Sequence, residues 1–365
     1  MAAIKIIHAS DFHLDSAFGG LPEEKSRQRR QESRQLMDRL AALVNAEQAQ
    51  LVLLTGDLFD SVRAYPETVE RLQAALASMT CPVFITPGNH DPLVPGSPYL
   101  EGKWPENVHI FRSEDLTAVE LPELNCVVYG AAFTSPQRQG EALQNFSAPA
   151  DGKIHIGCLH GEVDGGGSPH DVATREQIAR SGLDYLAMGH IHRGSGLQKE
   201  GKTVWAYPGC LEGRGFDELG EKGLLVGTVE QGKADLEFVP LCRRRYRIIE
   251  ADVTGRSIQE TMKDALQAVD EDICRVILTG ETADETPDLA ALERDFAGYC
   301  YFLQLRDETR VARDIWERAG EDSLRGLFLS ELRRRYDAAA DEEERKKIDL
   351  AVRFGLAALD GRDIG

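Results

Sequence analysis

Near the start of the chain, short apolar runs alternate with longer stretches that mix apolar and polar residues. Ile4 to Ala9, Leu51 to Thr55 and Pro82 to Thr86 are apolar runs of strand length. Glu23 to Ala46 and Pro66 to Met79, which separate them, have helical composition, and the second begins with proline, as many helices do. This β-α-β-α-β order predicts parallel strands joined by crossover helices.

Later apolar runs predict a β-rich continuation up to about residue 240. The further expected strands are Val108 to Phe111, Cys126 to Ala131, Lys153 to Leu159, Tyr185 to Met188, Thr203 to Tyr207, Gly223 to Val229 and Ala234 to Pro240. The expected first domain therefore covers residues 1–242 and mixes α/β with a β-rich part.

The pattern changes after Cys242. Residues 246–307 read as strand, helix, strand, helix, strand, which predicts a small α+β domain over 243–312. From Arg313 onward the pattern is helical, with Leu324, Leu327, Phe328, Leu332 and Tyr336 at spacings of three or four. We expect a helical C-terminal region over 313–365, and an α+β chain overall.

Composition narrows the class of protein. With 42% apolar residues, the 365-residue chain can bury a core, and it carries a net charge of −19. We expect a cytoplasmic protein outside the membrane, since no secretory leader or membrane-length apolar run is present and seven cysteines are scattered singly. The negative charge argues against coating nucleic acid non-specifically. It leaves room for a local basic site, for which Arg243, Arg244, Arg245 and Arg247 are candidates.

Residues able to bind metal occur where the apolar runs stop. The five motifs are Asp11-Phe12-His13, Gly56-Asp57-Leu58-Phe59-Asp60, Gly88-Asn89-His90-Asp91, His160 in Cys-Leu-His-Gly, and Gly189-His190-Ile191-His192. Open α/β sheets place ligand-binding loops at such strand ends. Carboxylates mixed with imidazoles suit Mn²⁺, Fe²⁺ or Zn²⁺ and suit Ca²⁺ poorly. Five such motifs together predict a metal centre far more strongly than any single histidine does.

The remaining histidines receive other interpretations. His8 and His155 lie inside predicted strands and His109 near the start of one, so we expect them to be structural. His170, in a glycine-rich loop, stays open.

The amino-acid sequences of the motifs resemble those of one protein family. H-A-S-D-F-H-L-D, G-D-L-F-D, P-V-F-I-T-P-G-N-H-D-P and G-H-I-H resemble the calcineurin-like metallophosphoesterases, and most of all their SbcD-like and YhaO-type DNA-repair exonuclease branch. Ser61-Val62 and Asp91 stand where protein phosphatases of the family usually have Arg-Gly and Glu. The resemblance, strong over residues 1–240, implies a two-sheet β-sandwich flanked by helices, with a small α+β cap and a helical tail.

The resemblance also implies the roles of individual residues. It assigns one ion to Asp11, His13, Asp57 and His192 (metal site A) and another to Asp57, Asn89, His160 and His190 (metal site B). His90 is implied as the acid that protonates the leaving oxygen, and Asp60 could fix its tautomer or cap a turn. Asp15 and Asp91 could support the ligands or merely shape turns. The implied cofactor is two divalent ions, with Mn²⁺ preferred.

Three interpretations of the function stay open. The first is a manganese-dependent DNA exonuclease or endonuclease in DNA repair, whose partners are DNA and an SMC-type, SbcC-like ATPase with a coiled coil. The second is a small-molecule or cyclic-nucleotide phosphodiesterase. The third is a mainly architectural subunit of an ATPase complex. The cap and the tail favour the first by resemblance, which implies that the apolar stripe of the tail (residues 313–365) docks on the ATPase. Packing of that stripe within the chain itself is the alternative, and dimerisation stays open.

Overall fold

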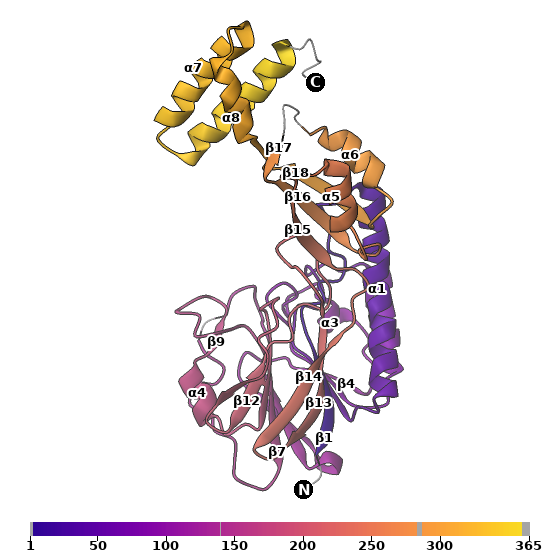
Figure 1. Ribbon diagram of the computed structural model, residues 1–365. Helices are drawn as coiled ribbons and strands as arrows, with labels where there is room; N and C mark the ends of the chain where they lie inside the picture. The colour runs from indigo at the N-terminus through magenta and orange to yellow at the C-terminus, as the bar shows by residue number, and fades with distance from the viewer. Residues whose placement is uncertain (1–2, 139, 283–286, 360–365) are drawn as a thin grey trace. The chain divides into compact units, whose positions relative to one another are not determined.

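A computed structural model describes residues 3–138, 140–282 and 287–359. The chain folds into two compact units, Met1–Arg244 and Arg245–Gly365. Two six-stranded sheets form the centre of the first unit (Figure 1). The first sheet contains, in spatial order, β14 (Lys233–Pro240), β13 (Gly223–Glu230), β1 (Ile4–Ala9), β2 (Leu51–Leu54), β3 (Val83–Ile85) and β4 (Val108–Ile110). The second contains β11 (Gln198–Glu200), β12 (Thr203–Ala206), β10 (Tyr185–Gly189), β7 (Ile154–His160), β6 (Cys126–Gly130) and β5 (Thr117–Leu121).

Alternating residues of the strands serve two cores. In β1, Ile4 and Ile6 lie in the core between the two sheets, whereas Ile7 and Ala9 face α1 (Glu23–Ala46) and α2 (Pro66–Ala77) on the outer face. A third cluster covers the other face of the second sheet, where α4 (Arg175–Arg180) lies. The order is therefore helix, sheet, sheet, helix, which confirms the expected two-sheet sandwich flanked by helices.

The parallel opening is confirmed as well. β1, β2, β3 and β4 are mutually parallel neighbours, as are β6, β7, β10 and β12 in the second sheet. Parallel neighbours bring their carboxyl ends to one edge, so the loops that follow them can meet there. The smaller elements of this unit are α3 (Pro98–Glu101), the 3₁₀ turn η1 (Pro122–Leu124), β8 (Glu162–Val163) and β9 (Asp171–Ala173).

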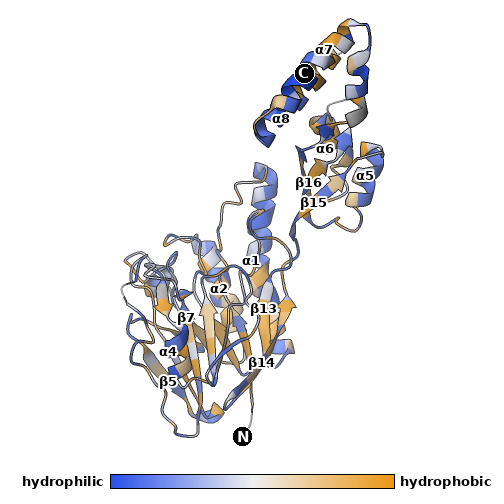
Figure 2. Ribbon diagram, turned by 60° about the vertical axis from the view of Figure 1, so that its left-hand side comes forward, coloured by the Kyte–Doolittle hydropathy of each residue, from blue (hydrophilic) through white to orange (hydrophobic). Residues whose placement is uncertain are grey.

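The second unit begins with an α+β segment. Its strands β15 (Tyr246–Asp252), β16 (Ile273–Thr279) and β18 (Phe302–Asp307) form a parallel sheet, joined through α5 (Ile258–Ala265) and α6 (Leu289–Phe296). The short strands β17 (Glu281–Thr282) and β19 (Arg310–Val311) pair with each other. Figure 2 shows hydrophobic residues along the sheet strands and a mixture of hydrophilic and hydrophobic residues along the helices.

The C-terminal helices bury part of the apolar stripe that the sequence suggests as a docking surface. After the 3₁₀ segment η2 (Arg313–Gly320), α7 (Leu324–Ala338) and α8 (Glu342–Leu359) pack together; residues 360–365 of the expected tail lie outside the described residues. Leu332 is buried in their shared core and Phe328 and Tyr336 pack against it, but Leu324 and Leu327 are 70% exposed. The expectation that these five residues form one exposed stripe is therefore wrong. A docking surface on α7 can use only Leu324 and Leu327. Within the described residues, no helix is both long and apolar enough to cross a membrane.

Candidate metal centre

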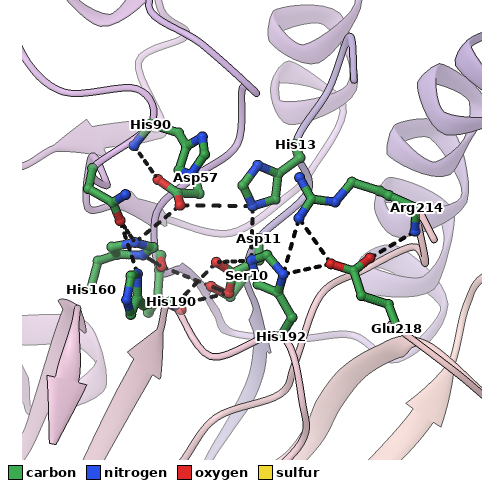
Figure 3. Close-up of polar contacts among 12 residues, drawn as sticks. Ser10, Asp11, His13, Asp57, His90, His160, His190, His192, Arg214 and Glu218 are labelled. Atoms are coloured by element: carbon green, nitrogen blue, oxygen red, sulfur yellow. Dashed lines mark hydrogen bonds and ion pairs between the residues drawn. The ribbon is translucent and has the colours of Figure 1, made fainter. Parts of the chain in front are cut away.

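The predicted ligands follow the carboxyl ends of neighbouring strands in both sheets. Asp11 and His13 follow β1, Asp57 follows β2, and Asn89 follows β3. In the second sheet, His160 is the last residue of β7, and His190 and His192 follow its neighbour β10. The structure brings all seven predicted ligands together at one edge of the sandwich (Figure 3 labels six of them).

Four of these residues have an unusual backbone. Asp11, His13, Asp57 and His190 have φ angles of 53°, 45°, 49° and 102°, in the left-handed region that side chains other than glycine rarely adopt. Main-chain hydrogen bonds hold the conformation, from Asp11 N to Gly56 O and from His13 N to Asp57 O. Strain of this kind concentrates at functional sites, where the surrounding fold stabilises it.

Metal site A consists of four side chains whose acceptor atoms converge. The Nε2 atoms of His13 and His192 lie 3.1 Å apart. Asp11 Oδ1 is 3.7 Å from His192 Nε2, and Asp57 Oδ2 is 3.8 Å from His13 Nε2. Ligand-type atoms this close to one another could hold one ion between them.

Metal site B has the same character and shares one atom with site A. Asn89 Oδ1 lies 3.0 Å from His160 Nε2 and 3.0 Å from His190 Nδ1. Asp57 Oδ2, which faces His13 in site A, is also 3.3 Å from His160 Nε2. The Asp57 carboxylate therefore faces both sets of side chains, where it could contact two ions at once.

The second nitrogen of every histidine ligand shows that the residues fit divalent ions. Each contacts an oxygen that can only accept: His13 Nδ1 contacts Asp60 (3.2 Å), His160 Nδ1 the Thr55 carbonyl (2.8 Å), His192 Nδ1 Glu218 (2.7 Å) and His190 Nε2 Glu162 (3.4 Å). Such a contact puts the ring proton on that nitrogen and leaves the other with a lone pair toward the site. Converging lone pairs and buried carboxylates are stabilised by cations.

Electrostatics point the same way. Burial by itself disfavours the charged Asp57 carboxylate, but His160 and His13 more than offset this and hold its pKa below the ordinary value. Burial also opposes protonation of His160, yet Asp57 and Asp11 outweigh it and raise the pKa of His160 to about 9. The carboxylates thus stabilise positive charge on His160, where a bound cation could replace the proton, whereas burial and the neighbouring His160 lower the pKa of His190 to about 4.

His90 stands at the open side of the centre. Its backbone N–H donates to Asp57 Oδ1 at 2.9 Å, and its exposed ring lies 4.8 Å from the His13 ring. The Asp60 carboxylate contacts His13 and Arg214, so the expected contact between Asp60 and His90 does not come from this group. The Asp60 main-chain carbonyl instead lies 3.3 Å from His90 Nδ1, so Asp60 orients His90 through its backbone and His13 through its side chain.

The aspartates left open in the sequence both shape loops. Asp15 contacts Arg34, Thr68 and the Tyr65 amide. Asp91 is buried and accepts from the Gly88 and Phe59 amides and the Tyr99 hydroxyl. The turn interpretation therefore fits both residues.

His170 lies beside metal site B. Its ring is 4.9 Å from that of His190, and together with Glu162 these residues offer ligand-type atoms within 4.8 Å of one another.

Sequence reasoning missed Arg214, Glu218 and Glu162. Arg214 and Glu218 lie in a polar loop after β12, whose carboxyl end is next to that of β10. Their four-residue spacing in a glycine-rich loop was a weak signal, because nothing local relates them to His192. Glu162, two residues after His160, is equally inconspicuous.

The basic cluster is only partly available to a ligand. Arg244 is buried and binds Glu32 through Nε and Nη2 at 2.9 and 2.6 Å, so its expected role in substrate binding is wrong. Arg245 and Arg247 contact Asp272 but remain about 40% exposed, and Arg243 is exposed.

The chain is similar to known proteins over most of its length. Residues 4–194 match the family described as "Calcineurin-like phosphoesterase", a segment that contains every residue of metal sites A and B. The chain is 29% identical to the "Uncharacterized metallophosphoesterase YhaO" of Bacillus subtilis (strain 168), over 94% of this chain and 95% of that protein. It is 26% identical to one subunit of the nuclease SbcCD of Staphylococcus epidermidis, over 71% of this chain and 75% of that protein. The crystal structure of TT1561 of Thermus thermophilus is 12% identical, with a TM-score of 0.41 over 65% of this chain and 99% of that one.

Proposed function

This chain belongs to the calcineurin-like phosphoesterase family, and from that membership we propose that it is a two-metal phosphodiesterase that cleaves DNA with Mn²⁺. The observation that carries the proposal is the shared Asp57 carboxylate, which faces His13 of metal site A and His160 of metal site B. Asp57 and the side chains of metal sites A and B would hold two ions, which would supply an activated water and compensate the charge that develops at phosphorus.

The protein's own residues account for orientation and proton transfer. The shared Asp57 also accepts the His90 amide, so the loop that carries His90 is tied to the centre. The Asp60 carbonyl accepts a hydrogen bond from the His90 Nδ1–H, so the Nε2–H of the protonated ring is left to donate its proton to the departing oxygen. We therefore assign His90 as the general acid and Asp60 as the residue that fixes its orientation.

Mn²⁺ is the metal we assign. Carboxylate and amide oxygens from Asp11, Asp57 and Asn89 are hard donors, which suit Mn²⁺ better than the softer ions that thiolates select. Fe²⁺ and Zn²⁺ also accept this donor set and are the alternatives.

DNA is the substrate favoured by the parts of the chain beyond the metal centre. Similarity to a nuclease subunit extends over 71% of the chain, beyond the matched phosphoesterase segment. The half-exposed Arg245 and Arg247, with the exposed Arg243, lie around the start of β15 and offer charge for a phosphate backbone. A small phosphodiester would need neither feature.

We further propose that the tail binds the coiled coil of an SMC-type ATPase in DNA repair. Leu324 and Leu327 on α7 are 70% exposed, and Leu350 and Phe354 on α8 are about 45% exposed. The two residues of each pair lie about one helical turn apart on their own helix, and exposed apolar patches are typical of surfaces that bind another protein. Helices bound in a partner's groove use anchors at such spacings.

A cleavage assay tests this function. The purified chain is incubated with single- and double-stranded DNA and, in parallel, with a chromogenic phosphodiester, each with Mn²⁺ or Mg²⁺. We expect DNA cleavage that is strongest with Mn²⁺. Cleavage of the small diester alone would favour a small-molecule phosphodiesterase, and metal binding without cleavage of either substrate would favour the architectural role.

A further inference from the structure

Arg214 joins the two carboxylates that hold histidines of metal site A. Its Nη1 lies 3.1 Å from Asp60 Oδ1, the same oxygen that contacts His13 Nδ1. Its Nη2 lies 2.9 Å from Glu218 Oε1, the same oxygen that contacts His192 Nδ1 at 2.7 Å. Figure 3 shows Arg214, Glu218 and His192 lying side by side. One guanidinium therefore reaches His13 through Asp60, and it reaches His192 both through Glu218 and directly, since Nη2 lies 3.1 Å from His192 Nδ1.

The main chain closes the same network. The Arg214 amide donates to Glu218 Oε2 at 2.8 Å, so both oxygens of this carboxylate are held by Arg214. The Glu218 side chain is only 7% exposed, so Arg214 and His192 contact a carboxylate that is almost entirely enclosed by the protein. Glu218 thus lies fixed between Arg214 and His192.

We propose that Arg214 is a positioning residue that sets the affinity of metal site A by clamping Asp60 and Glu218 against His13 and His192. The inference rests on the two-metal function proposed above. Metal site B lacks this support among the described residues, since its histidines contact the Thr55 carbonyl and Glu162. Loss of Arg214 should therefore weaken site A and spare site B.

The competing explanation is that the positively charged Arg214 side chain binds a phosphate of the substrate directly. The contacts of Arg214 argue against it, because both terminal nitrogens of the guanidinium already face carboxylates and its side chain is 22% exposed. A phosphate clamp would affect KM for DNA and leave metal affinity unchanged.

The direction in which loss of Arg214 changes the metal affinity distinguishes a positioning role from a purely electrostatic one. Removing a positive charge near two metal sites makes the potential more negative, which by itself strengthens cation binding. Removing a clamp frees two carboxylates and two imidazoles, which weakens binding, typically by about 10- to 100-fold for such outer contacts. A fall in affinity thus reports positioning, and an unchanged or higher affinity does not.

The test is Mn²⁺ titration of the Arg214→Met protein, followed by EPR of bound and free Mn²⁺. Arg34→Met is a matched control, because Arg34 also bridges two carboxylates, Asp15 and Glu67, and is 21% exposed. We expect wild type and Arg34→Met to bind two Mn²⁺ with a coupled spectrum. Arg214→Met should lose about 10- to 100-fold in affinity at one site and show an uncoupled spectrum at limiting metal.

The other outcomes distinguish failure of this inference from failure of the proposed function. Two sites of unchanged or higher affinity in Arg214→Met would overturn the inference and leave the proposed function standing. Absence of Mn²⁺ binding in the wild type would refute the proposed function itself. If Arg214→Met does not fold, Glu218→Ala and Glu218→Gln decide. The glutamine still offers His192 an acceptor, so it should keep more affinity at site A, and equal wild-type affinity in both would contradict the inference.

Discussion

Gly88 leaves no room for a side chain beside the bridging ligand, so Gly88→Ala should disable the metal centre. A methyl group at this position would lie 2.1 Å from Asp57 Oδ1 and 2.6 Å from Asp57 N. Non-bonded carbon and oxygen atoms need more than about 3 Å, so the carboxylate or the loop must move by about 1 Å. Displacements of that size at a reacting centre cost about 10²-fold in rate.

The same displacement also breaks a contact that places His90. Asp57 Oδ1 accepts the His90 amide at 2.9 Å, so a shifted carboxylate also shifts the loop that carries the proposed acid. We expect Gly88→Ala to lose at least one bound metal and about 10²-fold or more in turnover of a chromogenic phosphodiester.

The assay combines metal analysis of metal-replete protein, turnover, and thermal unfolding of the metal-free form. Gly20→Ala is the control, since a methyl group there meets nothing within 4 Å. It should keep both metals and full turnover. If Gly88→Ala does the same, the close approach of this loop to Asp57 is not required, and the geometry of the site is wrong.

Three further predictions address other parts of the chain. His90→Ala should keep both metals and lose about 10²–10⁴-fold in turnover, so loss of metal or full activity would contradict the acid role. Arg244→Met breaks a buried pair with Glu32 and should cost about 3 kcal/mol in denaturant unfolding, with no change in the salt dependence of DNA binding. Leu329→Ala, at a buried position of α7, should destabilise the second unit by about 2–5 kcal/mol. Leu324→Ser, at an exposed position of the same helix, should leave unfolding unchanged but weaken co-purification with the ATPase, and normal co-purification would refute the docking surface.

Most long elements could be predicted because their sequences carry strong periodicity. The helix Glu23–Ala46 and the strand Ile4–Ala9 have the predicted bounds. Two edge strands were not predicted for physical reasons. Gln198–Glu200 contains no apolar residue, and its strand conformation is set by pairing with β12. Thr117–Leu121 is half exposed and gains its place from β6.

The convergence of the metal-binding motifs could be predicted and the contacts that support them could not. The motifs follow strand ends, and parallel neighbours bring such ends together, whereas the division of their residues between two ions came from the family resemblance. The supporting contacts join residues distant in sequence, such as Arg214 with Asp60. The burial of Arg244 also depends on tertiary packing against Glu32, which no property of its arginine-rich segment indicates.

The location of the ions is the most direct test of the central claim. Crystals grown with Mn²⁺ and measured at the manganese absorption edge would show each ion as an anomalous peak. We predict two peaks roughly 3.5–4 Å apart on either side of Asp57, one beside His13 and His192 and the other beside His160 and His190. A single peak, or peaks away from Asp57, would contradict a two-metal phosphodiesterase.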